Sequence, residues 1–204
     1  ALGPIDFDAI LEDPSHAWML GAASHPFEGE TRPDELMREG AYSWCKAPRL
    51  NGAPVETGAL ARQIIDGHPL ARALASEGGV RARIVGRLLE LARSQIFMEE
   101  LALAIAPRER FLQSVELPAQ GRGAGLVEAA RGALGHWLRL EGGKLAGYQI
   151  IAPTTWNFSP RDAQGVAGPL EAALEGTAVD AEGRGLRVQH VVRSFDPCMV
   201  CTVH

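Results

Sequence analysis

The spacing of apolar residues predicts several helices in the middle of the chain. Residues 55–67, VETGALARQIIDG, have the polar start and the glycine stop of a helix. Residues 68–106 carry apolar side chains at helical spacing, and the break at Glu77–Gly79 separates a short helix from a long one of about 25 residues. We expect the long helix to be a pillar of the core. Its apolar positions are Val80, Ile84, Leu88, Leu89, Leu91, Ile96, Leu101 and Leu103.

A β-hairpin is predicted in the second half of the chain. Residues 118–124, PAQGRGA, are read as a glycine-rich connection. HWLRL (136–140) and KLAGYQII (144–151) alternate apolar and polar residues, and EGGK between them supplies a tight turn. The proline, asparagine and serine content of PTTWNFSPRDAQG (153–165) indicates a loop.

The two ends of the chain complete the prediction. Residues 1–55 are broken by proline and glycine and are read as loops with one short helix near Phe7–Leu20. GPLEAALEG is a further short helix, and a last helix starts near Leu186 and must end or kink at Pro197. We therefore predict a mainly α fold with a small β-hairpin region and a helical-bundle core, in one domain over residues 1–204.

Composition excludes several classes of protein. The chain has 204 residues, 46% of them hydrophobic, which is typical of a globular protein. Its net charge of −5 argues against a nucleic-acid binder. There is no run of 18 apolar residues that could span a membrane, and no signal peptide. The chain opens without an initiator methionine, so we expect it to be a fragment.

The strongest chemical signal is the ending DPCMVCTVH, in which Cys198 and Cys201 are three residues apart. In a turn, this spacing places two sulfurs on one side, near enough to share a soft or borderline metal. A lone C-x-x-C could also be half of a zinc site, a redox pair or two incidental core cysteines. The chain has no second C-x-x-C, and this pair lies at the extreme C-terminus. A metal half-site completed by ligands elsewhere therefore fits best.

Four motifs, in order, carry a resemblance to the large subunits of nickel–iron hydrogenases. DPCMVCTVH resembles the family's D-P-C-x-x-C-x-x-H signature. EAARGALGHW resembles E-A-P-R-G-x-L-x-H, and YQIIAPTTWNFSPRD resembles V-P-x-T-W-N-x-x-P-R. HPFEGETRPD followed by YSWCKAPRLNGAPVETGALAR resembles the family's mid-chain stretch. The resemblance extends from about Ala22 to His204 and implies the large-subunit fold of these enzymes.

The resemblance implies a role for each matching residue. Cys198 resembles the terminal nickel ligand, and Cys201 resembles a thiolate that bridges nickel and iron. Arg131 resembles the guanidinium over the open face of the metals, with Asp196 holding it. Thr154 resembles the hydroxyl that hydrogen-bonds an iron-bound cyanide. The cofactors so implied are a nickel–iron centre with CN and CO ligands on iron, and a Mg²⁺ bound by His204 and the main-chain carbonyl of Ile150.

Two departures from the family pattern matter. The N-terminal C-x-x-C, which supplies the other two metal thiolates in the family, is absent from this sequence. We therefore expect this chain to require the N-terminal part of the large subunit and to be inactive by itself. Ala130 stands where many members have proline, which changes the surroundings of a cyanide ligand rather than a metal ligand.

The function implied is the heterolytic oxidation of H2, with electrons passed to an iron–sulfur small subunit in an obligate heterodimer. The alternatives are a hydrogen-sensing regulatory hydrogenase and, from another class, a non-catalytic zinc-binding structural module. We expect a cytoplasmic protein whose association with a membrane, if any, is indirect. A periplasmic location after export with the small subunit is the alternative.

Several other polar or aromatic residues have competing interpretations. His136 and Trp137 are expected to pack rather than to act in the site, and His25 and Glu28 to do structural work. Cys45 is expected to behave as a small buried hydrophobe. Residues of CKAPR could approach the site or the small subunit, or could form a structural salt bridge; these are Lys46, Pro48 and Arg49.

Overall fold

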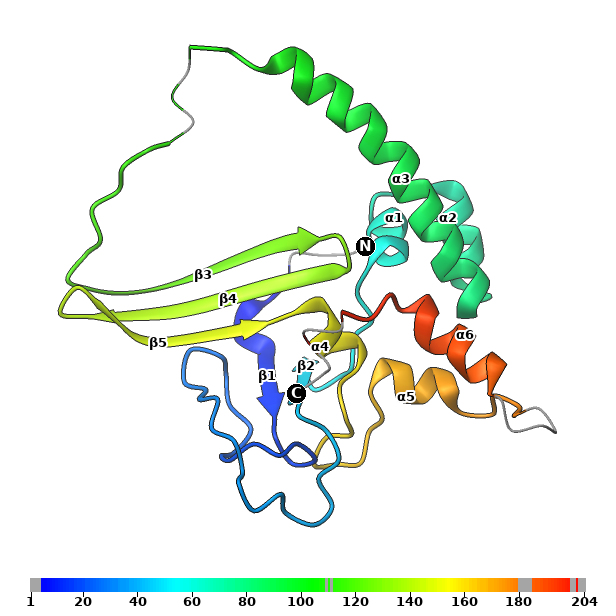
Figure 1. The fold of residues 1–204 in the computed structure, drawn as a ribbon, viewed down its shortest axis with the longest axis horizontal. Coiled ribbons are helices and arrows are strands. Elements are labelled where there is room, and N and C mark those ends of the chain that lie inside the picture. The colour runs from blue at the N-terminus through cyan, green and yellow to red at the C-terminus, as the bar shows by residue number, and fades with distance from the viewer. Residues whose placement is uncertain (1–4, 109, 111, 180–184, 199–200, 202–204) are drawn as a thin grey trace.

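The computed structural model describes residues 5–108, 110, 112–179, 185–198 and 201. Within these residues the fold is mixed α/β (Figure 1). A 3-10 turn at Phe7–Ala9 precedes the first strand. The other elements, in order, are β1 (Ile10–Asp13), β2 (Ala47–Leu50), α1 (Ala59–Ile65), α2 (Pro69–Ala75), α3 (Gly79–Ala104), β3 (Gln120–Ala129), β4 (Gly132–Glu141), β5 (Lys144–Ile151), α4 (Pro153–Asn157), α5 (Pro169–Leu174) and α6 (Leu186–Ser194).

The larger sheet is an antiparallel meander in the order β3-β4-β5. The predicted hairpin of β4 and β5 is confirmed. Gly142 and Gly143 form its turn with φ of 58° and 74°, values that favour glycine and suit a two-residue hairpin loop. The connection predicted at 118–124 is wrong in part, because β3 begins at Gln120. Its glycines are tolerated on an edge strand that is exposed almost throughout.

The hydrophobic core lies between the two sheets and α4. Ile10 from β1, Trp137 from β4, Ile151 from β5 and Trp156 from α4 are all buried and form one cluster. Flanking it are Phe27, Leu50 and Val55. The predicted helical-bundle core and mainly α class are therefore wrong for this chain. The cluster is built by strand pairing between distant segments, which helical periodicity cannot reveal.

Helix α3 packs against the rest of the chain through its inner half and the turn that follows, where Arg93 pairs with Asp66 at the end of α1. Ala82 and Gly86 are its buried residues, and a Cβ at Gly86 would lie 2.7 Å from the Cα of Leu60 in α1. The outer half projects from the molecule (Figure 1), and Leu91 and Leu103 are 68% and 89% exposed. The length of the predicted helix is confirmed, but within this chain its outer half is not a core pillar.

The remaining predictions had mixed outcomes. The short helices now seen as α2, α5 and α6 are confirmed, and α6 ends at Ser194, before Pro197. The helix near Phe7–Leu20 is wrong, because residues 10–13 pair with residues 47–50 as strands. One helical turn, α4, begins at Pro153 inside the predicted loop, where proline suits a first helical position. None of the helices that the structure describes is long and apolar enough to cross a bilayer.

Candidate metal centre

The C-terminal motif is positioned by two arginines of α3. The carbonyl of Ser194, the last residue of α6, accepts a hydrogen bond from Arg87 Nη1 at 2.6 Å. The Ser194 hydroxyl accepts one from Arg83 Nη1 at 3.3 Å. The Arg83 guanidinium also lies 3.7 Å from the centre of the buried Phe195 ring. Helix α3 therefore fixes the point at which the chain leaves α6 toward the cysteines.

A left-handed residue then turns the chain. Asp196 has a φ of 54°, a conformation that aspartate tolerates better than most residues, and its N–H donates to the carbonyl of Arg193 at 3.0 Å. Pro197 follows, and the N–H of Cys201 donates to the carbonyl of Cys198 at 3.0 Å. The two cysteines thus lie at the ends of a tight turn, as their spacing predicted.

Thr154 meets this turn from the opposite side. Strand β5 ends in the core at Ile151, and Pro153 starts α4, so that Thr154 is carried on the first turn of a short, buried helix. Thr154 is 2% exposed, and its Oγ1 accepts a hydrogen bond from the N–H of Cys198 at 3.2 Å. Because the hydroxyl accepts here, its own hydrogen is available to donate to a group bound between the cysteines.

The two thiols interact directly with each other. Burial is the main reason that the pKa of Cys201 rises to about 11. A hydrogen bond to the Cys198 side chain and the negative charges of the Cys198 and Cys45 thiolates raise this pKa further, and the positive charge of Arg131 lowers it. Burial also raises the pKa of Cys45. Without a metal the Cys201 thiol therefore keeps its proton at neutral pH. A metal ion must displace that proton to bind the thiolate.

Arg131 lies in a two-residue loop between β3 and β4. Arg62 of α1 holds this loop by donating to the carbonyls of Ala129, at 2.9 Å, and Ala130, at 3.0 Å. The loop is therefore clamped by a side chain from a distant helix rather than by its own sequence.

The other side of the same loop rests against residues 57 and 58. Gly132 has a φ of 133°, and a Cβ there would collide with Thr57 Oγ1 and lie 2.9 Å from the nitrogen of Gly58. Thr57 is itself fixed by the buried Asn157, which accepts from its N–H and donates to its carbonyl, both at 2.9 Å. Glycine after the arginine is thus required by close approach of two backbones.

Arg131 and Asp196 form a loose ion pair. Arg131 Nε is 3.8 Å from Asp196 Oδ2, and both side chains are about half exposed (45% and 46%). An ion pair of this exposure contributes little to folding. The pair borders a small pocket whose other lining residues are Glu56, Thr57, Gly58, Ala59, Leu60, Arg83, Arg87, Ala130, Ser194 and Phe195.

Three further predicted site residues can be placed only in part. The carbonyl of Ala130 is taken up by Arg62, so this residue acts in the structure through its backbone. Ile150 lies on β5 and pairs with His136 of β4. It precedes Thr154, on the first turn of α4, by four residues. His204 lies outside the described residues.

A buried polar cluster next to Ile150 was not predicted. Lys46 Nζ lies 3.5 Å from Glu12 Oε2 and 3.4 Å from Gln149 Oε1, and Thr31 donates to the same Gln149 oxygen at 3.0 Å. Burial raises the pKa of Glu12 despite the opposing charge of Lys46. Only Lys46 drew attention in the sequence. The available signal was Gln149, a polar residue on the inward face of an alternating strand.

The other residues singled out in the sequence have structural roles. Trp137 is 1% exposed in the core, and His136 Nδ1 is 2.7 Å from the Tyr148 hydroxyl on the neighbouring strand, so packing is confirmed for both. Arg49 forms a buried salt bridge. Cys45 is buried, as expected, but its thiol also makes a polar contact.

The donor set fits half of a soft-metal centre. Two thiols share one side of a turn, and a hydroxyl and a guanidinium lie around it. Among the described residues, no group of three or more histidine, cysteine, aspartate and glutamate side chains is arranged to hold a metal ion. Thiolates suit nickel, iron or zinc, and each of these needs more ligands than two.

Comparison with known proteins identifies a family, and the family indicates which of these metals is expected. The sequence profile of nickel-dependent hydrogenases matches residues 1–204. The chain belongs to the nickel-dependent hydrogenase family. It is 34% identical to the hydrogenase-1 large chain of Citrobacter freundii and 30% identical to the uptake hydrogenase large subunit of Rhodobacter capsulatus, with 98% of this chain aligned to each.

Solved structures agree with this assignment. A variant of the NiFeSe hydrogenase from Desulfovibrio vulgaris Hildenborough superposes with a TM-score of 0.89 at 31% identity, over 99% of this chain and 46% of that one. For the reduced, active Ni-Fe-Se hydrogenase from Desulfomicrobium baculatum the TM-score is 0.87 at 32% identity, with the same coverage. The large-subunit fold is therefore confirmed. The chain spans 40% and 41% of the Citrobacter and Rhodobacter hydrogenase large chains.

Proposed function

We propose that this chain is the C-terminal part of the large catalytic subunit of a nickel–iron hydrogenase, which oxidises H2 to two protons and two electrons. The observation that carries the proposal is the contact between the C-terminal thiol pair and α4, in which Thr154 Oγ1 accepts from Cys198 N at 3.2 Å. That contact joins two motifs 44 residues apart into one site within a chain of the nickel-dependent hydrogenase family.

Each residue then has a defined task. Cys198 and Cys201 would hold the nickel–iron centre, Cys201 as the bridging thiolate. When bound, the metal pair supplies the Lewis-acid and redox chemistry that the unpolarised H–H bond requires. The Sγ of Cys198 would be the group that accepts the proton, since a thiolate held by a metal keeps a lone pair. Arg131 positions the substrate and stabilises charge, since a guanidinium is a poor base, and Asp196 orients it.

Two ligand contacts complete the proposed centre. The Thr154 hydroxyl would donate to a cyanide on iron, and Ala130 would lie beside these diatomic ligands. A Mg²⁺ ion would be held by the main-chain carbonyl of Ile150 and by His204. The carboxylate of Glu12 and the amide oxygen of Gln149, the residue before Ile150, contact Lys46 in a buried cluster.

The proposed enzyme needs two partners. The sequence has no iron–sulfur motif, so electrons would leave through an iron–sulfur small subunit. The other two metal thiolates would come from the N-terminal part of the large subunit. We propose a cytoplasmic location, with any membrane association made indirectly through these partners.

Metal analysis of the assembled enzyme that contains this chain tests the proposal. We expect about one nickel per large subunit, with iron in excess of nickel because the small subunit carries iron–sulfur clusters, and reduction of a viologen dye that depends on H2. The measurements are elemental analysis by mass spectrometry and the dye assay under anaerobic conditions. Zinc bound in place of nickel, without reduction of the dye, would instead indicate a zinc-binding structural module and end the hydrogenase proposal.

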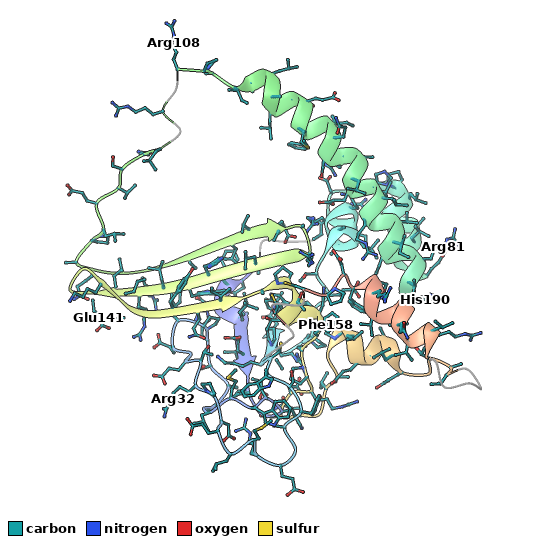
Figure 2. The ribbon with its side chains drawn as sticks, viewed as in Figure 1. Arg32, Arg81, Arg108, Glu141, Phe158 and His190 are labelled. Atoms are coloured by element: carbon teal, nitrogen blue, oxygen red, sulfur yellow. The ribbon has the colours of Figure 1, made fainter. Side chains whose placement is uncertain are left out.

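The outer half of α3 is the surface that we propose for the N-terminal part of the large subunit. This half-helix exposes its apolar residues to solvent, and Figure 2 shows side chains standing out along it and along the chain that follows, as far as Arg108. Exposed apolar surface of this extent is uncommon on a monomeric soluble protein. More than half the length of the relatives lies outside the matched region. The exposed apolar residues from the middle of α3 to its end are Leu88, Leu91, Ile96, Phe97, Met98, Leu101 and Leu103, and Ile105 follows directly.

Truncating this face in the complete large subunit is expected to lower its stability. If Phe97 and Leu101 are covered there, Phe97→Ala and Leu101→Ala each cost about 2–5 kcal/mol of unfolding free energy, measured by denaturant unfolding. Arg81→Ala is the matched control at the exposed inner end of the helix, where only a loose ion pair with Glu77 is lost. Losses below about 0.5 kcal/mol for both apolar variants, the size typical of exposed sites, would contradict this docking surface.

A further inference from the structure

Cys45 lies beside the proposed metal centre although no family motif assigns it a role. It precedes β2, it is 9% exposed, and its N–H donates to the Ser43 hydroxyl at 3.0 Å. The backbone of residue 45 is therefore held locally. Its side chain points to the C-terminal turn, 156 residues further along the sequence.

The contact made by this side chain is a hydrogen bond to the backbone of a proposed metal ligand. Cys45 Sγ lies 3.4 Å from the carbonyl oxygen of Cys201. A carbonyl oxygen can only accept, so the thiol is the donor. A thiol is a weak donor, but the bond is sheltered from water and fixes the orientation of the peptide group that follows Cys201.

We propose that Cys45 is a positioning residue, whose thiol holds the Cys201 carbonyl and thereby sets the direction of the proposed bridging thiolate. Its importance for metal binding rests on the proposed function, whereas the hydrogen bond itself does not. The peptide group that it holds stands between Cys201 and the last three residues, which include His204.

The neighbouring residue strengthens the geometric argument. Lys46 comes directly after Cys45 and binds Glu12 and Gln149 in the buried polar cluster next to Ile150. One short segment thus touches the C-terminal turn through Cys45 and β5 through Lys46. Since β5 leads into α4 and Thr154, this segment ties together the two sides of the proposed centre.

Three substitutions separate a donor role from simple packing. Cys45→Ser keeps a donor, Cys45→Val keeps apolar bulk without a donor, and Cys45→Ala removes both. In the metal-free complete large subunit, hydrogen exchange of the peptide covering residues 198–204 is measured by mass spectrometry. We expect exchange to be about threefold faster in the valine and alanine variants, as the loss of one weak hydrogen bond predicts, and close to wild type in the serine variant. This arm needs no metal and stands even if the proposed function fails.

The second arm measures the metal centre itself. In the assembled enzyme we expect the valine and alanine variants to lose nickel to a chelator about three- to tenfold faster than wild type, with serine within about twofold. Thermal unfolding confirms that each variant is folded. A valine variant that matches wild type in both exchange and nickel retention, with serine impaired, would show that Cys45 only fills space and would overturn the proposal.

Discussion

Replacing Cys198 by serine is expected to remove nickel from the assembled enzyme and to lower H2 oxidation by at least about 100-fold. Replacing even an outer contact of a metal ligand often costs 10- to 100-fold in affinity or activity, and a direct ligand should cost more. Serine is nearly isosteric but offers a hard oxygen with a much higher pKa, which suits nickel poorly. Elemental analysis and the H2-dependent dye assay give the two readouts.

Arg131→Lys is the matched comparison for that experiment. Lysine keeps the positive charge next to Asp196 but lacks the planar group that the 3.8 Å ion pair orients. We expect full nickel content with turnover reduced at least about tenfold. Cys198→Ser should lose both nickel and activity, whereas Arg131→Lys should lose activity and keep its nickel. That difference would separate a residue that binds the metal from one that acts in catalysis. A Cys198→Ser enzyme that retains nickel and activity would show that Cys198 is not a ligand.

The chemical half of the site could be predicted because its signals are local. The sequence supplied Pro197 and the spacing of Cys198 and Cys201, and in the structure a hydrogen bond from the Cys201 N–H to the Cys198 carbonyl closes that spacing. Thr154 was identified by the resemblance of its motif to a family segment, although the sequence predicted a loop where α4 begins at Pro153. Motifs of this kind need no knowledge of the rest of the fold.

The residues that hold these site residues in place could not be predicted, because they act through contacts between segments far apart in the sequence. The loop that carries Arg131 is held by Arg62, and the C-terminal turn by Arg83 and Arg87. All three are helical arginines, and the sequence alone treats them as ordinary surface charges. Whether an arginine on a helix meets solvent or a backbone carbonyl depends on which face the fold covers.

The same reason explains the errors in the fold. Residues 10–13 became a strand because residues 47–50 lie opposite, a pairing that local propensity does not contain. Apolar spacing along α3 correctly predicted a helix with apolar positions that need cover, yet the partner for its outer half is not among the described residues. Apolar periodicity indicates that one face of a helix should be buried, but it does not identify the element that covers that face.

A buried salt bridge between Arg49 and Asp162 links two segments that lie far apart in the sequence. Arg49 Nε donates to Asp162 Oδ2 at 2.8 Å, and both residues are almost fully buried. The other guanidinium hydrogens are satisfied by the Ser159 hydroxyl and by main-chain carbonyls, so that no donor is wasted. The pair fastens the loop after α4 to β2, and with it the position of Thr154.

Breaking this pair is expected to produce the largest loss of stability. Arg49→Met leaves the Asp162 charge buried without its partner, which should cost about 3–5 kcal/mol of unfolding free energy. Arg161→Met is the matched control, because the neighbouring arginine is 44% exposed and its ion pairs, at 3.9 and 3.8 Å, are loose. Its expected cost is below about 1 kcal/mol. Denaturant unfolding of the complete large subunit measures both, and equal costs would contradict the prediction.

The pH dependence of stability provides an independent check on the same pair. Burial alone would raise the pKa of Asp162, but the hydrogen bonds from Arg49 and from main-chain N–H groups outweigh it and lower the pKa below its usual 3.8. A carboxylate with a depressed folded pKa stabilises the protein above its unfolded pKa, and the contribution is lost as the pH falls through the folded value. We therefore expect wild-type stability to decline below about pH 4, and Asp162→Asn to flatten that decline while lowering stability at pH 7. An acid limb with the same slope in both proteins would show that Asp162 does not titrate through this pair.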